Sequence, residues 1–158
     1  MPNGWPETGT RRTVVNDVVA SEEERPVIKH EEARQIISAA VRKAEEIGQP
    51  MNIAVMDAGR NLLAFERMDG AWVASIDIAI DKAFTSAGRG LSTRKIGEMA
   101  QPGQPLFGIN TTNGGRIVIF AGGLPLVRDG EVVGAIGVSG GSVDQDEEAA
   151  EAGVAAFQ

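Results

Sequence analysis

Hydrophobic and polar residues alternate in two parts of the chain, and the period becomes helical between them. In the first part, residues 52–56 and 61–67 alternate around a short polar turn at 57–60, which is typical of a β-hairpin. Gly59 is expected to supply the positive φ that such a turn needs. The second part contains short apolar runs separated by glycine-containing turns, at 116–120, 124–127 and 131–139. Two meander blocks that bracket a helical block predict a small antiparallel sheet with helices packed against it.

Helical periodicity is clearest after His30, where one apolar stripe continues to Ile47. Gly48 and Pro50 are expected to end this helix. A second helix is predicted at 72–88, a short third at 92–99 with Ser92 as its N-cap, and a last one from about residue 144. The second is apolar around most of its girth, which is typical of a helix that is buried on two sides or lies at a subunit interface.

The polar stripe of the second helix is short. It consists of Asp77, Asp81 and Lys82, and the two aspartates are expected to be solvated. Residues 101–115 then form a long loop rich in glycine and proline, and loops of this kind often carry function.

The length of 158 residues indicates one domain, placed at 27–158, preceded by an arm at 1–26. The arm contains glycine, proline and charged residues with little periodicity. Two interpretations of it remain open: a segment ordered against a neighbouring subunit, or a disordered tail.

Composition excludes several classes of protein. The chain has no cysteine, which rules out disulfides, iron–sulfur clusters, thiolate zinc sites and cysteine nucleophiles. One histidine and no tyrosine argue against a multi-histidine metal centre. A net charge of −7 argues against nucleic acid or an anionic membrane as a partner. Without a membrane-spanning run or a convincing signal sequence, the protein is expected to be cytoplasmic.

Two places could carry chemistry. His30 is either a surface or capping residue or an axial ligand of haem iron, for which a single imidazole is enough. The loop at 110–116 is rich in hydroxyls and amides and ends in Arg116, which could pair with a carboxylate. A surface turn of this composition also exists without any ligand.

Several short segments, taken in order, resemble one known family. They are residues 54–59 (AVMDAG), 66–71 (ERMDGA), Ser75, Lys82-Ala83, 122–126 (GGLPL) and 134–140 (GAIGVSG), followed by Asp144. This set is similar to the GlcG/HbpS family, whose domain also forms the C-terminal part of PduO-type proteins.

The resemblance implies a profilin-like α+β domain, in which a five-stranded antiparallel sheet is flanked by helices in an α/β/α arrangement. It implies assembly as dimers and often octamers, and haem binding as the best-described activity of some members. In haem-binding relatives the ligands are a histidine near the first helix or a threonine, with the pocket near a subunit contact. His30 stands at a comparable place as the haem-iron ligand, and Thr111 or Thr112 is the candidate for the second ligand.

Three functions follow from these observations. The first is an oligomeric protein that binds haem or another small molecule, with the following candidate ligand-binding residues: His30, Arg67, Asp69, Lys82, Thr111, Thr112, Asn113 and Arg116. The second is an enzyme, a lyase, hydratase or isomerase acting on a small carboxylate metabolite. Arg67 or Arg116 would then hold the carboxylate, while Asp69, Lys82 or His30 would move protons. The third is a structural partner of another enzyme. Apart from haem, no cofactor is expected.

Overall fold

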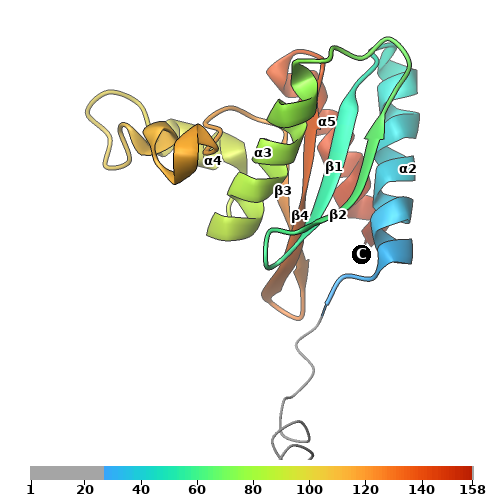
Figure 1. Ribbon diagram of the computed structural model, residues 1–158, viewed down its shortest axis with the longest axis horizontal. Helices are drawn as coiled ribbons and strands as arrows, with labels where there is room; N and C mark the ends of the chain where they lie inside the picture. Colours follow the sequence, from blue (N-terminus) through green and yellow to red (C-terminus); the bar gives the residue numbers. More distant parts are fainter. Residues whose placement is uncertain (1–26, 158) are drawn as a thin grey trace, which may run out of the picture.

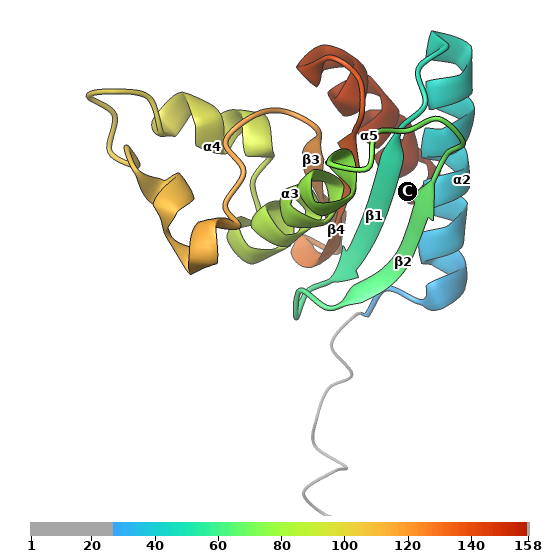
Figure 2. The same cartoon turned by 45° about the horizontal axis from the view of Figure 1, so that its top comes forward.

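The computed structural model describes residues 27–157, in which helices cover both faces of an antiparallel sheet (Figure 1). Helices α2 (His30–Ile47) and α5 (Val143–Phe157) lie against one face, and α3 (Ser75–Arg89) lies against the other (Figure 2). This arrangement confirms the predicted α+β class. The arm predicted at 1–26 lies outside the described residues. Within 27–157, no helix combines the length and the apolar character that crossing a bilayer requires.

Among residues 27–157, the sheet has four strands in the order β2-β1-β4-β3, and each neighbouring pair is antiparallel. The strands are β1 (Asn52–Asp57), β2 (Leu62–Arg67), β3 (Gly123–Arg128) and β4 (Glu131–Ser139). Alternation along β1 divides the core: Ile53 and Val55 pack with α2 and α5, whereas Ala54 and Met56 pack with α3. The central strand is therefore buried on both faces.

The expectation of five strands was wrong, because residues 116–120 do not join the sheet. Their backbone bonds instead to a side chain of α3. The amide of Val118 donates to Thr85 Oγ1 at 3.0 Å, and this hydroxyl lies 3.2 Å from the carbonyl oxygen of Arg116. Helix α4 (Thr93–Met99) also lies close, since a Cβ added at Gly97 would be 2.1 Å from the carbonyl oxygen of Ile119. Residues 116–120 thus make these contacts with helices and not with another strand. Their alternating pattern alone therefore predicted a strand wrongly.

The β1–β2 turn differs from the prediction in one detail. Arg60, rather than Gly59, has the positive φ, of 66°. The amide of Asn61 donates to Asp57 Oδ1 at 2.9 Å, which draws that side chain across the turn. A Cβ at residue 59 would lie 2.9 Å from Asn61 Nδ2. A side chain at residue 59 would therefore press on the side chains of Asn61 and Asp57 and not on backbone.

Residues 90–122 leave the body of the domain after α3 and project to one side (Figures 1 and 2). They contain α4 (Thr93–Met99) and the short turns η1 (Ile109–Thr111) and η2 (Asn113–Gly115). Ser92 caps α4 as predicted, accepting the amide of Lys95 at 3.1 Å. This projecting segment places the 110–116 loop far from α2 (Figure 1).

Candidate functional site

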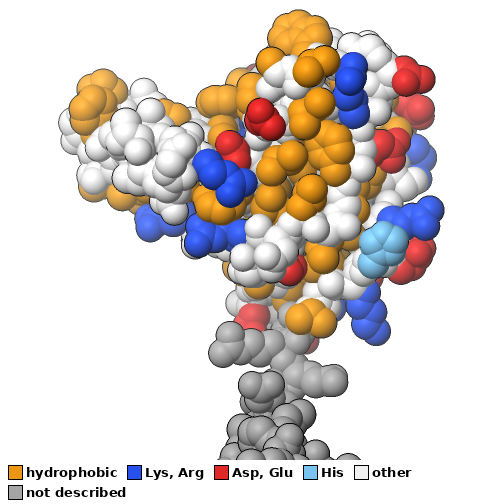
Figure 3. Space-filling model, viewed as in Figure 1, with side chains coloured by type: hydrophobic (Ala, Val, Ile, Leu, Met, Phe, Trp, Pro, Cys, Tyr) orange, Lys and Arg blue, Asp and Glu red, His pale blue; other side chains and the backbone are white. Residues whose placement is uncertain are grey.

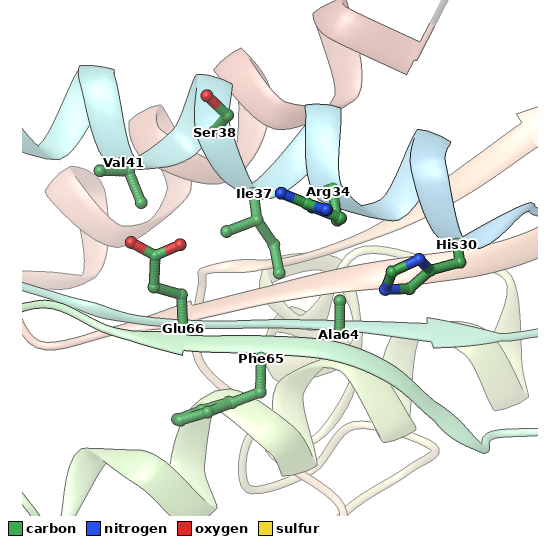
Figure 4. Close-up of a pocket in the computed structure, with 8 residues that line it drawn as sticks. All are labelled: His30, Arg34, Ile37, Ser38, Val41, Ala64, Phe65 and Glu66. Atoms are coloured by element: carbon green, nitrogen blue, oxygen red, sulfur yellow. The ribbon is translucent and has the colours of Figure 1, made fainter.

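A groove of about 530 Å³ lies between α2 and the edge strand β2, and we call it the α2–β2 groove (Figure 4). It exists because β2 is the last strand of the sheet, so that its α2-facing side is only partly covered. Eight residues line it: His30, Arg34, Ile37, Ser38, Val41, Ala64, Phe65 and Glu66.

The groove has an apolar floor and a polar rim. Ile37 and Val41 face Ala64 across it, whereas Phe65 points to the opposite side of the sheet (Figure 4). His30 and Glu66 stand near its two ends, with the guanidinium of Arg34 between them (Figure 4). His30 and Arg34 are one helical turn apart, which places both on the same face of α2. The groove therefore offers an imidazole, a cation and an apolar surface to one ligand.

The backbone that carries His30 is held by a capping box. Glu32 accepts the amide of Lys29 at 2.7 Å and also pairs with Arg128 of β3. These bonds to the ionised carboxylate, chiefly the one from the Lys29 amide, lower the pKa of Glu32 below its usual 4.5. The first turn of α2, and His30 with it, is thus fixed to the end of β3.

We expect Glu32→Gln to remove part of the acid sensitivity of the fold. A carboxylate with a lowered pKa in the folded state stabilises fully above about pH 4.5 and loses that contribution as the pH falls through its folded-state pKa. The variant should therefore be less stable than the parent near neutral pH, by less than about 1 kcal/mol because solvent screens the pair. Urea unfolding between about pH 6 and about pH 3 should show this difference shrinking. Glu45→Gln, an exposed change on the same helix, is the control, and a constant difference for Glu32→Gln would contradict the prediction.

The groove residues fit haem. An exposed imidazole at one end can ligate iron, the floor is apolar, and Arg34 can pair with a propionate. Within residues 27–157, no cluster of three or more histidine, aspartate and glutamate side chains is arranged to hold a bare metal ion.

Lys82 lies in the core, although the helical pattern assigned it to the polar part of its helix. Its side chain is 0% exposed, and Nζ donates to Asp146 Oδ2 at 2.7 Å and to the carbonyl oxygen of Val138 at 2.8 Å. The second oxygen of Asp146 accepts the amide of Gly141 at 2.8 Å. Burial lowers the pKa of Lys82 and raises the pKa of Asp146, which their mutual attraction opposes. This pair ties α3 to the start of α5.

The loop residues proposed as ligands lie on the projecting segment. The hydroxyls of Thr111 and Thr112 donate to the carbonyl oxygens of Gly108 and Ile109, at 2.8 and 2.7 Å. Asn113 Nδ2 donates to Thr112 Oγ1 at 3.1 Å. These three side chains are exposed, and the segment that carries them lies on the opposite side of the domain from α2 (Figure 1).

Arg116 is engaged by α3. Its Nε donates to Asp81 Oδ1 at 2.7 Å, and its guanidinium lies 3.7 Å from the centroid of the Phe84 ring. Asp81 is only 24% exposed, so the expectation that it is freely solvated was wrong.

Arg67 is the last residue of β2 and Asp69 follows shortly after it, and both are exposed. Arg67 Nε donates to the carbonyl oxygen of Ala71 at 3.3 Å. The eight residues singled out from sequence are thus distributed over four places: the α2–β2 groove, the end of β2, the core, and the projecting segment with Arg116. The structure brings His30 together instead with Arg34 and Glu66, which sequence reasoning missed. Their signal was present in the one-turn spacing from His30 to Arg34 and in the alternation of β2.

Comparisons with known proteins agree on one family. The family model described as haem degrading protein HbpS-like matches residues 28–155. An uncharacterized 15.0 kDa protein in the dhaT-dhaS intergenic region of Citrobacter freundii is 45% identical over 125 residues, which are 79% of this chain and 88% of that protein.

Two further relatives extend this result. Corrinoid adenosyltransferase PduO of Citrobacter freundii is 36% identical over 138 residues, which are 87% of this chain but only 41% of PduO. Among solved structures, the crystal structure of a PduOC:haem complex matches with a TM-score of 0.80 and 33% identity, and covers 83% of this chain and 95% of that one. The similarity thus spans nearly all described residues, while most of PduO has no counterpart here.

Proposed function

The chain belongs to the HbpS-like family, and from this premise we propose that it binds haem in the α2–β2 groove, with His30 as the axial ligand of the iron. The observation that carries the proposal is the position of the only histidine of the chain, on the rim of a groove of about 530 Å³ whose floor is formed by Ile37, Val41 and Ala64. Small-molecule sites in proteins typically have volumes of about 300 to 1,000 Å³.

Each part of haem has a partner in the groove. The porphyrin face would lie on Ile37, Val41 and Ala64, which present aliphatic carbon to it. Arg34 would bind a propionate, and the capping box would hold His30 in place. The carboxylate of Glu66 would keep the propionates away from its end of the groove, because like charges repel. A relative of 33% identity was crystallised as a haem complex, which supports this choice of ligand.

Self-association is the second part of the proposal. Apolar side chains gather along α3 and toward β2 on the face viewed in Figure 3. Trp72 is 68% exposed, Val73 66% and Leu62 48%. Half-buried Ile80 and Phe84 belong to α3, and Phe65 of β2 packs against the same cluster. An apolar face of this kind is typical of an interface. Since Thr111 and Thr112 lie far from His30 within one chain, either could ligate the same haem only from a second copy.

We expect haem titration of the parent protein to produce a Soret band of a histidine-ligated haem, with saturation at one haem per chain. His30→Ala should shift this band and weaken binding at least about tenfold, because the iron loses its strongest protein ligand. Ala64→Phe should weaken binding as well, since the added ring fills the groove while the imidazole remains. Lys95→Ala, at an exposed position on α4, is the matched control and should bind like the parent.

Unchanged spectra and affinity in both His30→Ala and Ala64→Phe would contradict this site.

An enzyme acting on a small carboxylate is less well supported by the geometry. The residues it needs, Arg67, Lys82 and Arg116, face three different places, and Lys82 is inaccessible to a ligand in this structure.

A further inference from the structure

A second pocket lies between α3 and the loop that returns to the sheet, and we call it the α3–loop pocket. Its volume is about 390 Å³. It is lined by Asp77, Ile78, Asp81, Asn110, Gly115 and residues 117–120. None of these residues lines the α2–β2 groove, which lies on the other side of the sheet. A haem in the groove would therefore leave this pocket free.

The pocket carries one uncompensated negative charge. Asp81 is neutralised by Arg116, whose Nε lies 2.7 Å from Asp81 Oδ1. Asp77 is exposed one helical turn away, and it forms no ion pair with the residues that the structure describes. The nearby ammonium of Lys82 is compensated by Asp146. The side chains around the pocket thus carry a net charge of −1, and Asp77 also lies in the first turn of α3, where the helix dipole favours a carboxylate.

The remaining lining is apolar and aromatic. Ile117, Val118 and Ile119 supply aliphatic surface, and Phe120 is 43% exposed. Lys82 Nζ lies 5.0 Å from the centroid of the Phe120 ring, so this ring already attracts one cation from the core. Asn110 adds an exposed amide from η1. The lining combines a carboxylate, an amide and an aromatic ring.

The pocket is preformed, because the loop that forms one of its walls is held against α3. Thr85 Oγ1 accepts the amide of Val118 at 3.0 Å and donates to the carbonyl oxygen of Asp81 at 2.7 Å. The ion pair of Arg116 with Asp81 fixes the same loop a second time. Both walls therefore keep their positions without a ligand, which lowers the entropic cost of binding.

We propose that the α3–loop pocket binds a small organic monocation, a primary or quaternary ammonium compound with an apolar body. The ammonium group would lie at the carboxylate of Asp77, and its body would lie against Phe120 and the isoleucines. A neutral or anionic molecule of the same shape lacks the charge that the site is built to balance. Within one chain this pocket lies apart from the α2–β2 groove, so the proposal does not rest on haem binding.

The test uses benzylammonium as the probe, with benzyl alcohol and benzoate as neutral and anionic compounds of the same shape. Isothermal titration of the full chain at low ionic strength should show benzylammonium binding at least about tenfold more tightly than either comparator. Asp77→Asn, which keeps the shape of the side chain, should remove most of this preference. Phe120→Leu should weaken benzylammonium about threefold to tenfold, because an apolar wall remains but the aromatic ring is lost.

Asp129→Asn is the matched control, since it removes one negative charge in the β3–β4 turn, away from the pocket. It should leave benzylammonium affinity unchanged. Equal binding of the three compounds would overturn the proposal, as would an affinity that falls by the same factor in Asp77→Asn and Asp129→Asn. The second result would show attraction to the net charge of the chain rather than a site. Displacement by equimolar Mg²⁺ would also overturn it, because it would indicate a site for inorganic ions.

Discussion

Lys82→Met should lower the free energy of unfolding by about 3 to 5 kcal/mol, which is the cost of removing one partner from a buried ion pair. The variant keeps the volume of the side chain but leaves the carboxylate of Asp146, 3% exposed, without its cation. It also removes the hydrogen bond to the carbonyl oxygen of Val138. Urea unfolding followed by circular dichroism, at fixed protein concentration, measures the change.

The double variant Lys82→Met/Asp146→Leu distinguishes the loss of the ion pair from a change in packing. It should recover a large part of the loss, because neither charge then remains buried alone. Lys95→Met is the control. Lys95 pairs with Glu98 on the surface, where each side chain is 58% exposed, so its loss should cost less than about 1 kcal/mol. A Lys82→Met variant as stable as Lys95→Met would refute the structural role of the pair.

Gly137→Ala should destabilise the protein by about 3 kcal/mol or more, because α3 lies directly on this residue of β4. A Cβ at position 137 would be 2.1 Å from the carbonyl oxygen of Ala79 and 2.5 Å from the amide nitrogen of Ala83. Both are backbone atoms, so the whole helix must move away from the sheet. That displacement would also disturb the bonds of Lys82, which lies between these two residues of α3.

Gly88→Ala, in α3, is the matched control for Gly137→Ala. A Cβ there would meet only the flexible side chain of Arg60, at 3.2 Å. Replacing a helical glycine by alanine stabilises by up to about 1 kcal/mol, so this variant should be neutral or slightly more stable. If the two glycine variants unfold at the same urea concentration, the close packing of α3 on β4 is contradicted.

The sequence predicted the fold well where periodicity and local capping agree. Helix α2 has a continuous apolar stripe and ends at Gly48, whose φ is 77°, so its bounds could be inferred from neighbours in sequence. Residues 116–120 have the same alternating pattern as a strand, but their partner is Thr85, distant in sequence. A hydrogen bond of this kind leaves no local signal, which is why a fifth strand was expected.

The candidate site was only partly predictable for the same reason. His30 attracts attention as the only histidine, whereas Glu66 becomes relevant only when β2 is placed beside α2. Lys82 falls on the polar stripe of an amphipathic pattern, and nothing near it in sequence shows that Asp146, 64 residues later, neutralises it in the core. Periodicity identifies the apolar and polar faces of helices, but it does not identify which polar residues form ion pairs in the core.

The crystal structure of the protein after titration with haem tests the central claim most directly. The account predicts one haem per chain in the α2–β2 groove, with a bond from the iron to a ring nitrogen of His30 and a propionate at Arg34. Haem bound away from His30, or crystals from haem-saturated solution with the groove empty, would contradict it.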